Sequence, residues 1–440
     1  MNRCRLLLWL GLSLFCGGAL FAQDVPTASE QAASEQFPVA RSKKGLQVQM
    51  VDDALNLGVQ HAAINLNLSQ LIDPKGQSQN PFWEMDGRKY HFRADYLRGL
   101  EHQFKPLSDR GVLIYLIMLV YAGGDDAINQ ILLHPHYDKA SQNRISAFNV
   151  QTEEGRNWLQ ATFRFLAHRW SMPDQQHGRV VGYIIGNEVN SHSAWANRGD
   201  VPANEFIDEY LTALRIAETA VHSQSSIPRI YVSLDHFWGR AMNQDSLRFM
   251  SGKMLLDRLA YRSRQTGDFP WHIAYHPYPE NLFQSEFWKD QSPTFSDQTP
   301  RITFKNLEVL VDYLKRPEML YAGKPRRIIL SEQGFHSSDH PASLEIQAAA
   351  YCLAWKKVEA IPEIDAFIYH RHVDHAQEGG LNLGLWGRAP NSISTPVWKK
   401  PIHRVFRLAD TPEWEQAFEF ALPIIGQPDW KSALQSLHTK

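Results

Sequence analysis

The stretch Val180-Val-Gly-Tyr-Ile-Ile-Gly-Asn-Glu188 decides the fold, because a hydrophobic run ends abruptly in two polar residues. A nearly continuous apolar run of this kind is typical of a strand that is buried on both faces of a parallel sheet. A second run, Arg327-Ile-Ile-Leu-Ser-Glu332, ends in the same way. Each run therefore predicts a carboxylate at the carboxyl end of a buried strand.

Runs of the same kind recur along the chain, and helical patterns separate them. Together with the two above, they cover residues 61–68, 111–120, 179–186, 229–235, 271–276, 327–331 and 364–369. In the stretches between them apolar residues stand three or four apart, as Phe206, Tyr210 and Leu214 do. A weaker first strand is expected at residues 37–41, ahead of a helical segment at residues 46–57.

This alternation of strands and helices predicts an α/β fold whose parallel sheet is covered on both faces. Eight strand-and-helix units make a (β/α)8 TIM barrel, which is the predicted fold. An open, doubly wound sheet is the alternative, because periodicity alone does not show closure. The aromatic-rich residues 411–440 are expected to form a helical extension on the outside of the barrel.

The composition fits one large globular domain. Of the 440 residues 43% are hydrophobic, and no linker divides the chain, so a single barrel domain with elaborated loops is expected at residues 37–440. The 45 Lys and Arg residues nearly balance the 47 Asp and Glu residues, which leaves a formal charge of -2. That balance argues against nucleic acid or an anionic membrane as partner.

Residues 1–22 have the pattern of a signal peptide. Arg3 and Arg5 precede an apolar run, and small residues follow before a possible cleavage point ahead of Gln23. The run is shorter than the about 20 residues that cross a membrane, so no stable membrane insertion is expected after cleavage. We therefore predict a bacterial secreted or periplasmic protein. Residues 23–36 lack periodicity and are expected to be a flexible spacer.

The cysteines agree with export without an internal disulfide. Cys4 and Cys16 lie in the predicted signal, so Cys352 alone remains in the exported domain. Cys16 leaves a lipoprotein open as an alternative, although the bulky Phe15 before it suits a lipid-attachment site poorly.

Polar and aromatic residues gather where the predicted strands end. They are Asn65, Asn67, Asn187, Glu188, Asp235, His236, Trp238, His276, Tyr278, Glu332, Tyr369, His370 and His372. Barrel active sites are built at that face. Sugars suit such a set, since their C–H faces stack on rings while their hydroxyls bind polar side chains. Two carboxylates held within about 5 to 10 Å can also cleave a glycosidic bond.

The strand-end motifs resemble those of the clan A retaining glycoside hydrolases. The resemblance lies in Gly186-Asn187-Glu188, in His276 and Tyr278, and in Ser331-Glu332-Gln-Gly334, and it spans most of the chain. It implies that Glu188 is the acid/base, that Glu332 is the nucleophile, that Asn187 contacts the sugar 2-hydroxyl and that Tyr278 contacts the nucleophile. The chain is also similar to a bacterial family of exported barrel proteins without an assigned activity.

The chain departs from that clan at two strand ends. Tyr369 and His370 stand where the clan often has a tryptophan, and Asn65 and Asn67 stand where it often has an arginine. We expect a carbohydrate substrate, no cofactor and no metal. Besides the two catalytic glutamates, the predicted substrate-binding residues are Asn65, Asn187, His236, Trp238, His276, Tyr278, Tyr369, His370 and Trp386.

Other interpretations of these residues stay open. Glu188 could instead pair with a cation such as Arg198, and Trp238, Tyr278 and Trp386 could be packing at the rim. A barrel that binds a glycan without cleaving it would carry the same groove.

A metal-dependent hydrolase is the chemical rival. The string His370-Arg-His372-Val-Asp374-His375 has metal-ligand spacing, and strand-end residues could converge on an ion. The residues in question are His236, His276, His372 and Asp374.

Overall fold

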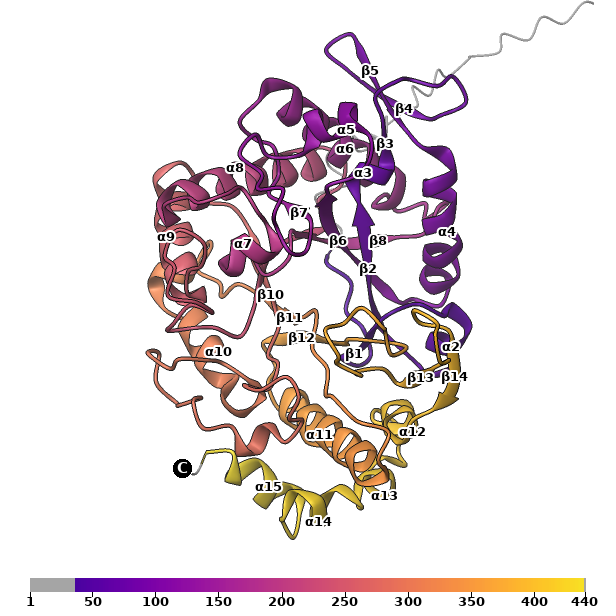
Figure 1. Cartoon of the computed structure of the whole chain (residues 1–440), viewed down its shortest axis with the longest axis vertical. Helices are drawn as coiled ribbons and strands as arrows, with labels where there is room; N and C mark the ends of the chain where they lie inside the picture. The colour runs from indigo at the N-terminus through magenta and orange to yellow at the C-terminus, as the bar shows by residue number, and fades with distance from the viewer. Residues whose placement is uncertain (1–35, 439–440) are drawn as a thin grey trace, which may run out of the picture. The chain divides into compact units, whose positions relative to one another are not determined.

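The computed structural model describes residues 36–438, and its centre is a closed barrel (Figure 1). The barrel strands are β1 (Lys44–Gln47), β2 (His61–Asn67), β6 (Leu113–Tyr121), β8 (Val180–Ile185), β9 (Arg229–Leu234), β10 (Trp271–Tyr275), β11 (Ile328–Leu330) and β12 (Ile364–Tyr369). All pair in parallel in the order β2-β1-β12-β11-β10-β9-β8-β6, and β2 also pairs with β6, which closes the ring. The predicted TIM barrel is confirmed, and the open sheet is wrong.

The position expected for the first strand is wrong. Residues 37–41 form no strand, and β1 lies at Lys44–Gln47, where its end overlaps the segment at residues 46–57 that was expected to be helical. The helix that follows is short, α2 (Val51–Asn56). Position 45 of this strand has room only for glycine, because a Cβ there would lie 2.8 Å from Ile368 Cγ1 and 2.9 Å from the Cβ of His61. A four-residue strand with a glycine and a lysine has almost no hydrophobic signal.

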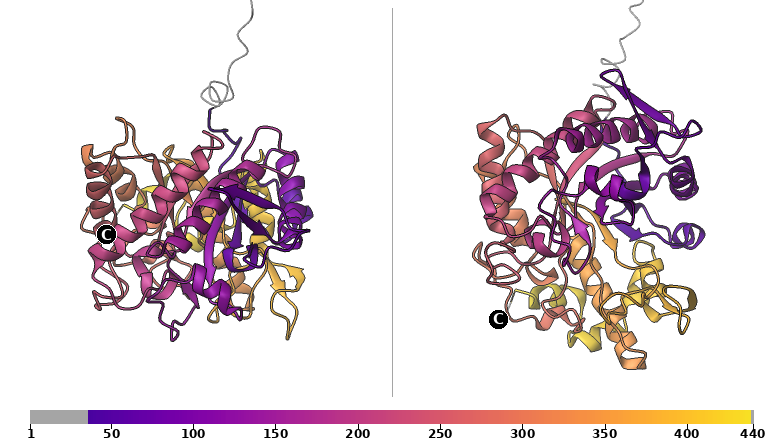
Figure 2. Two further views of the ribbon diagram at one scale, coloured as in Figure 1. Left: turned by 90° about the horizontal axis from the view of Figure 1, so that it is seen from above. Right: turned by 45° about the horizontal axis from the view of Figure 1, so that its top comes forward.

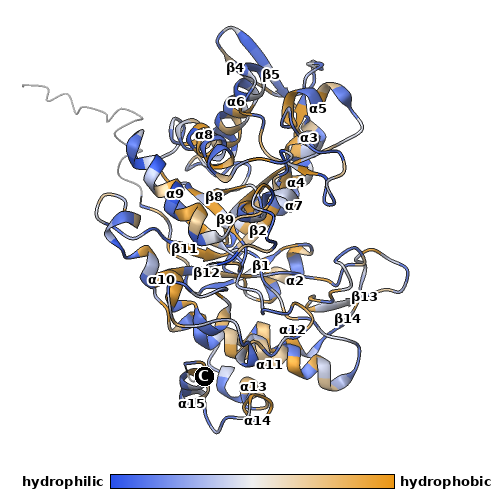
Figure 3. Cartoon of the chain, turned by 60° about the vertical axis from the view of Figure 1, so that its left-hand side comes forward, coloured by the Kyte–Doolittle hydropathy of each residue, from blue (hydrophilic) through white to orange (hydrophobic). Residues whose placement is uncertain are grey.

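Helices from the whole chain surround the strands, as the two views of Figure 2 show. The main ones are α4 (Ala94–Asp109), α6 (Glu153–Trp170), α8 (Ala203–His222), α9 (Gly252–Gln265), α10 (Glu308–Leu314) and α11 (Pro341–Glu359). Their apolar faces pack on the outer side of the barrel, and Phe206, Tyr210 and Leu214 of α8 are all buried there. The strands β8, β9 and β11 are largely orange in the hydropathy colouring of Figure 3. A second cluster, which includes Tyr115 and Tyr231, fills the barrel interior.

Short elements elaborate the loops at the carboxyl ends of the strands. The helical ones are α3 (Leu68–Leu71), α5 (Asp126–Leu132), α7 (His192–Trp195), η1 (Val189–Ser191), η2 (Phe287–Lys289) and η3 (Phe304–Asn306). A further short helix, η4 (Pro317–Met319), lies between α10 and the start of β11. The short strands are β3 (Ile72–Asp73), β4 (Phe82–Met85), β5 (Arg88–Phe92), β7 (Ile145–Ser146), β13 (Trp386–Arg388) and β14 (Pro396–Lys399). Strands β3 to β5 form an antiparallel sheet, and β13 pairs with β14.

The chain ends in the expected helical extension. It comprises α12 (Pro401–Leu408), α13 (Trp414–Phe418), α14 (Ala421–Ile425) and α15 (Trp430–Ser436). Helices α12, α14 and α15 contact α11 on the outside of the barrel. Cys352 of α11 is fully buried, and burial raises the pKa of its thiol well above the ordinary value.

The predicted signal peptide and nearly all of the predicted spacer lie outside the described residues. Among residues 36–438, no helix combines the length and the apolar character that crossing a bilayer requires.

Candidate active site

Glu188 stands on a sharp turn directly after β8. The strand ends at Ile185, Gly186 has a φ of 83°, and Glu188 itself is left-handed with a φ of 38°. This kink removes the alternation that would send Asn187 and Glu188 to opposite faces of a regular strand. The Glu188 N–H donates to Ser233 Oγ at 2.9 Å, which holds the turn against β9. A left-handed residue other than glycine costs about 1–3 kcal/mol and is concentrated at functional sites.

The side chain of Glu188 is buried against a histidine from the next strand but one. His276 Nδ1 donates to Glu188 Oε1 at 2.9 Å, and His276 Nε2 lies 3.0 Å from Ser331 Oγ. Burial lowers the pKa of His276, but the hydrogen bond to Glu188 and the charges of Glu332 and Glu188 outweigh it and raise that pKa. Arg198 pairs with Glu209 at 3.1 Å instead, so the pairing considered for Glu188 is wrong.

Glu332 follows β11 and is held by two side chains. The Tyr278 hydroxyl donates to Glu332 Oε1 at 3.2 Å, and Gln47 Nε2 donates to Glu332 Oε2 at 3.3 Å. Burial alone would raise the pKa of Glu332, but the positive charges of His370 and His276 prevail and lower it. The carboxyl group is therefore held in its ionised form, which is the form that a nucleophile needs.

The two glutamates face each other. One side-chain oxygen of Glu188, one of Glu332 and a ring nitrogen of His276 all lie within 4.8 Å of one another. Retaining glycosidases separate their two carboxyl groups by about 5–5.5 Å, and inverting enzymes by about 6.5–9.5 Å. The 4.8 Å bound on one pair of oxygens lies nearer to the shorter of these two separations.

Asp235 is a buried acid that the motifs did not single out for a role. Asn190 Nδ2 donates to Asp235 Oδ1 at 2.5 Å, the Phe237 N–H donates to the same oxygen at 2.8 Å, and the Ser191 hydroxyl donates to Oδ2. Burial and the negative charge of Glu188 raise the pKa of Asp235 to about 7. Asp235 thus ties the end of β9 to the residues that follow Glu188. In the sequence, the signal that could have identified Asp235 was its position directly after the last residue of β9.

His370 continues the contacts of Glu332 on the other side. Its Nδ1 lies 2.6 Å from Gln47 Oε1 and its Nε2 lies 3.3 Å from Glu378 Oε1. Glu378 also forms an ion pair with Arg371. Sequence reasoning missed Gln47 and Glu378, because Gln47 belongs to the misplaced first strand and Glu378 lies beyond the end of the string from His370 to His375.

The other predicted substrate-binding residues divide into two groups. Asn65 is exposed and lies on the same face of β2 as Ala63, which points into the barrel. Asn187 is 8% exposed beside Glu188. Trp238 and Tyr369 instead lie in the outer core, with no exposed surface. Their polar atoms donate to the carbonyls of Asp297 and Leu383, so their role in the structure is packing.

His236 and Trp386 support other groups. His236 is buried, and its Nδ1 donates to the carbonyl of Tyr278. It therefore holds in place the residue whose hydroxyl donates to Glu332. The Trp386 indole donates to Asp53 Oδ2 at 2.8 Å and packs edge-on against His403.

The residues of the metal alternative are not brought together. His372 binds Asp53 at 3.0 Å, and Asp374 forms an ion pair with Lys400 at 2.7 Å. Among residues 36–438, the His, Cys, Asp and Glu side chains form a single group with metal-ligand spacing, which is Glu188, His276 and Glu332. A metal there would compete with the hydrogen bond between His276 and Glu188.

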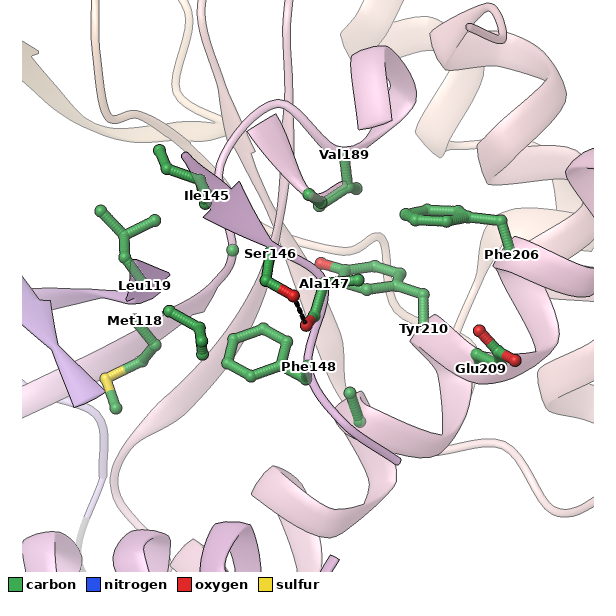
Figure 4. Close-up of a pocket in the computed structure, with 14 residues that line it drawn as sticks. Met118, Leu119, Ile145, Ser146, Ala147, Phe148, Val189, Phe206, Glu209 and Tyr210 are labelled. Atoms are coloured by element: carbon green, nitrogen blue, oxygen red, sulfur yellow. Dashed lines mark hydrogen bonds between the residues drawn. The ribbon is translucent and has the colours of Figure 1, made fainter. Parts of the chain in front are cut away.

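A small apolar cavity backs the turn that carries Glu188 (Figure 4). Val189 lines it from the turn, Phe206 and Tyr210 point into it from α8, and Phe148 lines it from the segment after β7. Its volume of about 20 Å³ has room for about one water, which takes about 10–15 Å³. The cavity is therefore too small for a sugar.

Solved glycoside hydrolases share the fold of this chain. A family 39 glycoside hydrolase from the gut symbiont Bacteroides cellulosilyticus WH2 has a TM-score of 0.51 at 14% identity, covering 82% of this chain and 60% of that chain. A hyperthermophilic β-glucosidase from Pyrococcus furiosus has a TM-score of 0.51 at 15% identity, covering 85% and 86%. Fpglu1 from Fervidobacterium pennivoraus has a TM-score of 0.53 at 12% identity, covering 88% and 85%. At these identities the likeness shows the barrel fold.

The sequence itself matches a family model. No curated protein is significantly similar to the chain. The model described as "Family of unknown function (DUF5722)" matches residues 36–433, which is almost all of the described region. A match of this extent shows membership, and the chain belongs to the DUF5722 family.

Proposed function

We propose that this protein is a retaining glycoside hydrolase in which Glu188 is the acid/base and Glu332 the nucleophile. One observation carries the proposal: one side-chain oxygen of each glutamate lies within 4.8 Å of the other at the carboxyl ends of barrel strands. That spacing suits a double displacement. The barrel fold shared with glycoside hydrolases adds support, although fold alone does not assign an activity.

The reaction proceeds in two steps. Glu332 attacks the anomeric carbon and forms a glycosyl ester, while Glu188 protonates the glycosidic oxygen as its bond to that carbon breaks. Glu188, now ionised, then takes a proton from a water molecule that displaces Glu332 and releases the sugar with its configuration retained. Tyr278 keeps its proton throughout, because burial and the charge of Glu332 raise its pKa well above the ordinary value.

Substitution of the two glutamates tests the proposal. The parent is first screened on 4-nitrophenyl glycosides of glucose, galactose, mannose and xylose in both anomeric forms. Glu188→Gln and Glu332→Gln should each lower kcat on the responsive substrate by about 10³-fold, since general acid–base and nucleophilic groups contribute on that order. The matched control Glu205→Gln changes a largely exposed carboxylate on α8 and should leave kcat within twofold. Unchanged turnover in both site variants would remove the assignment.

The same preparation separates the alternatives. A metallohydrolase would contain stoichiometric metal and lose activity on chelation, whereas the proposed enzyme should be insensitive to EDTA. A non-catalytic barrel would bind oligosaccharides in calorimetry without releasing reducing ends.

We also propose that the chain is exported, with its predicted signal peptide as the support. Amino-terminal sequencing of the protein from its native host should begin near Gln23. A chain that retains residues 1–22 in the cytoplasm would contradict export.

A further inference from the structure

We propose that Gln47, His370 and Glu378 form a hydrogen-bonded chain that positions and polarises Glu332, with His370 as its central positioning residue. This inference rests on the proposed function. The three side chains come from the end of β1, from the residue after β12 and from the loop beyond it. Strands β1 and β11 flank β12, so the chain of contacts crosses three adjacent strand ends to reach the carboxylate.

The partners of His370 determine where its protons are. Glu378 Oε1 is a carboxylate oxygen and can only accept, so the His370 Nε2–H donates to it at 3.3 Å. Gln47 has an amide oxygen toward His370 Nδ1, at 2.6 Å, and that oxygen also only accepts. Both ring nitrogens therefore donate, which makes His370 an imidazolium cation in this arrangement.

Glu332 and Ser331 fix the orientation of Gln47. Its amide nitrogen faces Glu332 Oε2 at 3.3 Å and the Ser331 carbonyl at 3.4 Å. Both of these are acceptors, so a flipped amide would place oxygen against oxygen at both contacts. The amide oxygen of Gln47 is therefore the atom that faces His370.

The centre of the chain is buried and anchored to the backbone. His370 is only 4% exposed, and its backbone N–H donates to the Gln333 carbonyl at 2.8 Å. Partial burial acts to raise the pKa of Glu378, but the hydrogen bond and charge of His370 and the charge of Arg371 lower it to about 2. Glu378 therefore stays ionised and provides a permanent negative charge behind the imidazolium.

The arrangement gives Glu332 a nearby positive charge without a direct ion pair. A cation in contact would occupy a carboxylate lone pair that has to attack carbon, whereas a cation one amide away stabilises the ionised form and leaves that lone pair free. His370 acts through Gln47, so it is a positioning residue and touches no substrate in this mechanism.

Two substitutions of His370 separate its hydrogen bond from its charge. His370→Asn can keep a donor toward Gln47 but loses the charge and the contact with Glu378, and His370→Leu loses all three. The matched control His102→Asn changes an exposed histidine on α4. The reaction used is the first step with the 2,4-dinitrophenyl glycoside of the sugar found in the screen, whose leaving group needs no acid.

The expected result is graded. His370→Leu should lower kcat/KM about 100-fold, with KM within threefold of the parent. The kcat/KM of His370→Asn should be about tenfold higher than that of His370→Leu, and that of His102→Asn should stay within twofold of the parent. A loss that falls entirely on KM, or a His370→Leu variant within threefold of the parent, overturns the proposal. Failure of Glu332→Gln to lose activity in the same assay would instead remove the proposed function.

A second measurement does not depend on turnover. The side-chain carboxyl of Glu332 is titrated by 13C NMR, with Glu332→Gln identifying its signal. The charged groups that face it are His276, His370, Glu188 and Glu378, with the Tyr278 hydroxyl. Loss of His370 should move the titration midpoint upward by at least half a pH unit in both His370 variants. If the variants are folded and the titration midpoint of Glu332 does not move, His370 does not polarise Glu332 and the proposal is overturned.

Discussion

Asp235 is a buried acid whose hydrogen-bond donors are all neutral, and its proton should make stability depend on pH. Its raised pKa of about 7 means that the native state keeps the proton where the unfolded chain, with a carboxyl pKa of about 3.9, has lost it. Between these values the native state binds more protons, so the contribution of Asp235 to stability falls as pH rises. Each pH unit of that window costs about 1.4 kcal/mol at most.

Asp235→Asn should remove this decrease in stability with rising pH. The amide keeps the shape of the side chain and has no proton to lose, so the Tm of the variant minus that of the parent should increase from pH 4 to pH 7. Thermal unfolding followed by circular dichroism at several pH values measures it. Asp312→Asn, which changes an exposed aspartate, should show no such trend. A pH-independent difference for Asp235→Asn would contradict the assigned ionisation.

At the scale of elements, the turn after β8 couples backbone geometry to chemistry. Gly186→Ala places a Cβ 3.1 Å from Val189 Cγ1 at a φ of 83°. The unfolding free energy should fall by about 1 kcal/mol, and kcat should fall at least tenfold because Glu188 is displaced. Chemical denaturation and steady-state kinetics measure the two effects.

Gly323→Ala is the matched control for that turn. Its φ is 74° and a Cβ there meets nothing within 4 Å, so it carries the same backbone strain in open space. We expect a similar loss of stability with kcat unchanged. Equal losses of kcat in both variants would mean that the turn has no special role.

The elements also show what a sequence can predict. A run such as β6 is apolar along its whole length and can be predicted as a strand from the sequence. The first strand was predicted too early in the chain, because β1 contains Gly45 and the buried Lys44. Glu188 and Glu332 could be found because each follows an apolar run. Gln47 could not, since its role depends on β1 lying beside β12, a pairing between opposite ends of the chain.

Side-chain direction set the second limit on prediction. Tyr369 and His370 were both expected to touch substrate, but alternation along β12 turns Tyr369 toward the helices. His370 then points toward Gln47, which donates to Glu332.

At the scale of the whole molecule, one carboxylate joins both ends of the barrel domain. Asp53 of α2 binds His372 after β12 at 3.0 Å, Trp386 of β13 at 2.8 Å and His403 of α12 at 3.4 Å. Burial would raise the pKa of Asp53, but these hydrogen bonds lower it well below the ordinary value. A depressed pKa stabilises the fold above the unfolded pKa of about 3.9, and that stabilisation is lost as pH falls further.

Asp53→Asn should therefore lower the unfolding free energy by about 2 kcal/mol at pH 7, the scale of a charged hydrogen bond. The difference in unfolding free energy between the variant and the parent should become smaller below pH 4. Urea unfolding at pH 7 and pH 3 measures it, and the exposed neighbour Asp52→Asn should stay within about 0.5 kcal/mol of the parent. A gap that is the same at both pH values would contradict the linkage.

The buried Cys352 makes the domain convenient for site-specific labelling. Without residues 1–22 it is the sole cysteine, and a thiol with no exposed surface and a raised pKa reacts slowly with maleimides. A cysteine introduced at the exposed Gln377, next to Glu378, would then be the one accessible attachment point. A fluorophore at that position would report movement of the loop that carries Glu378.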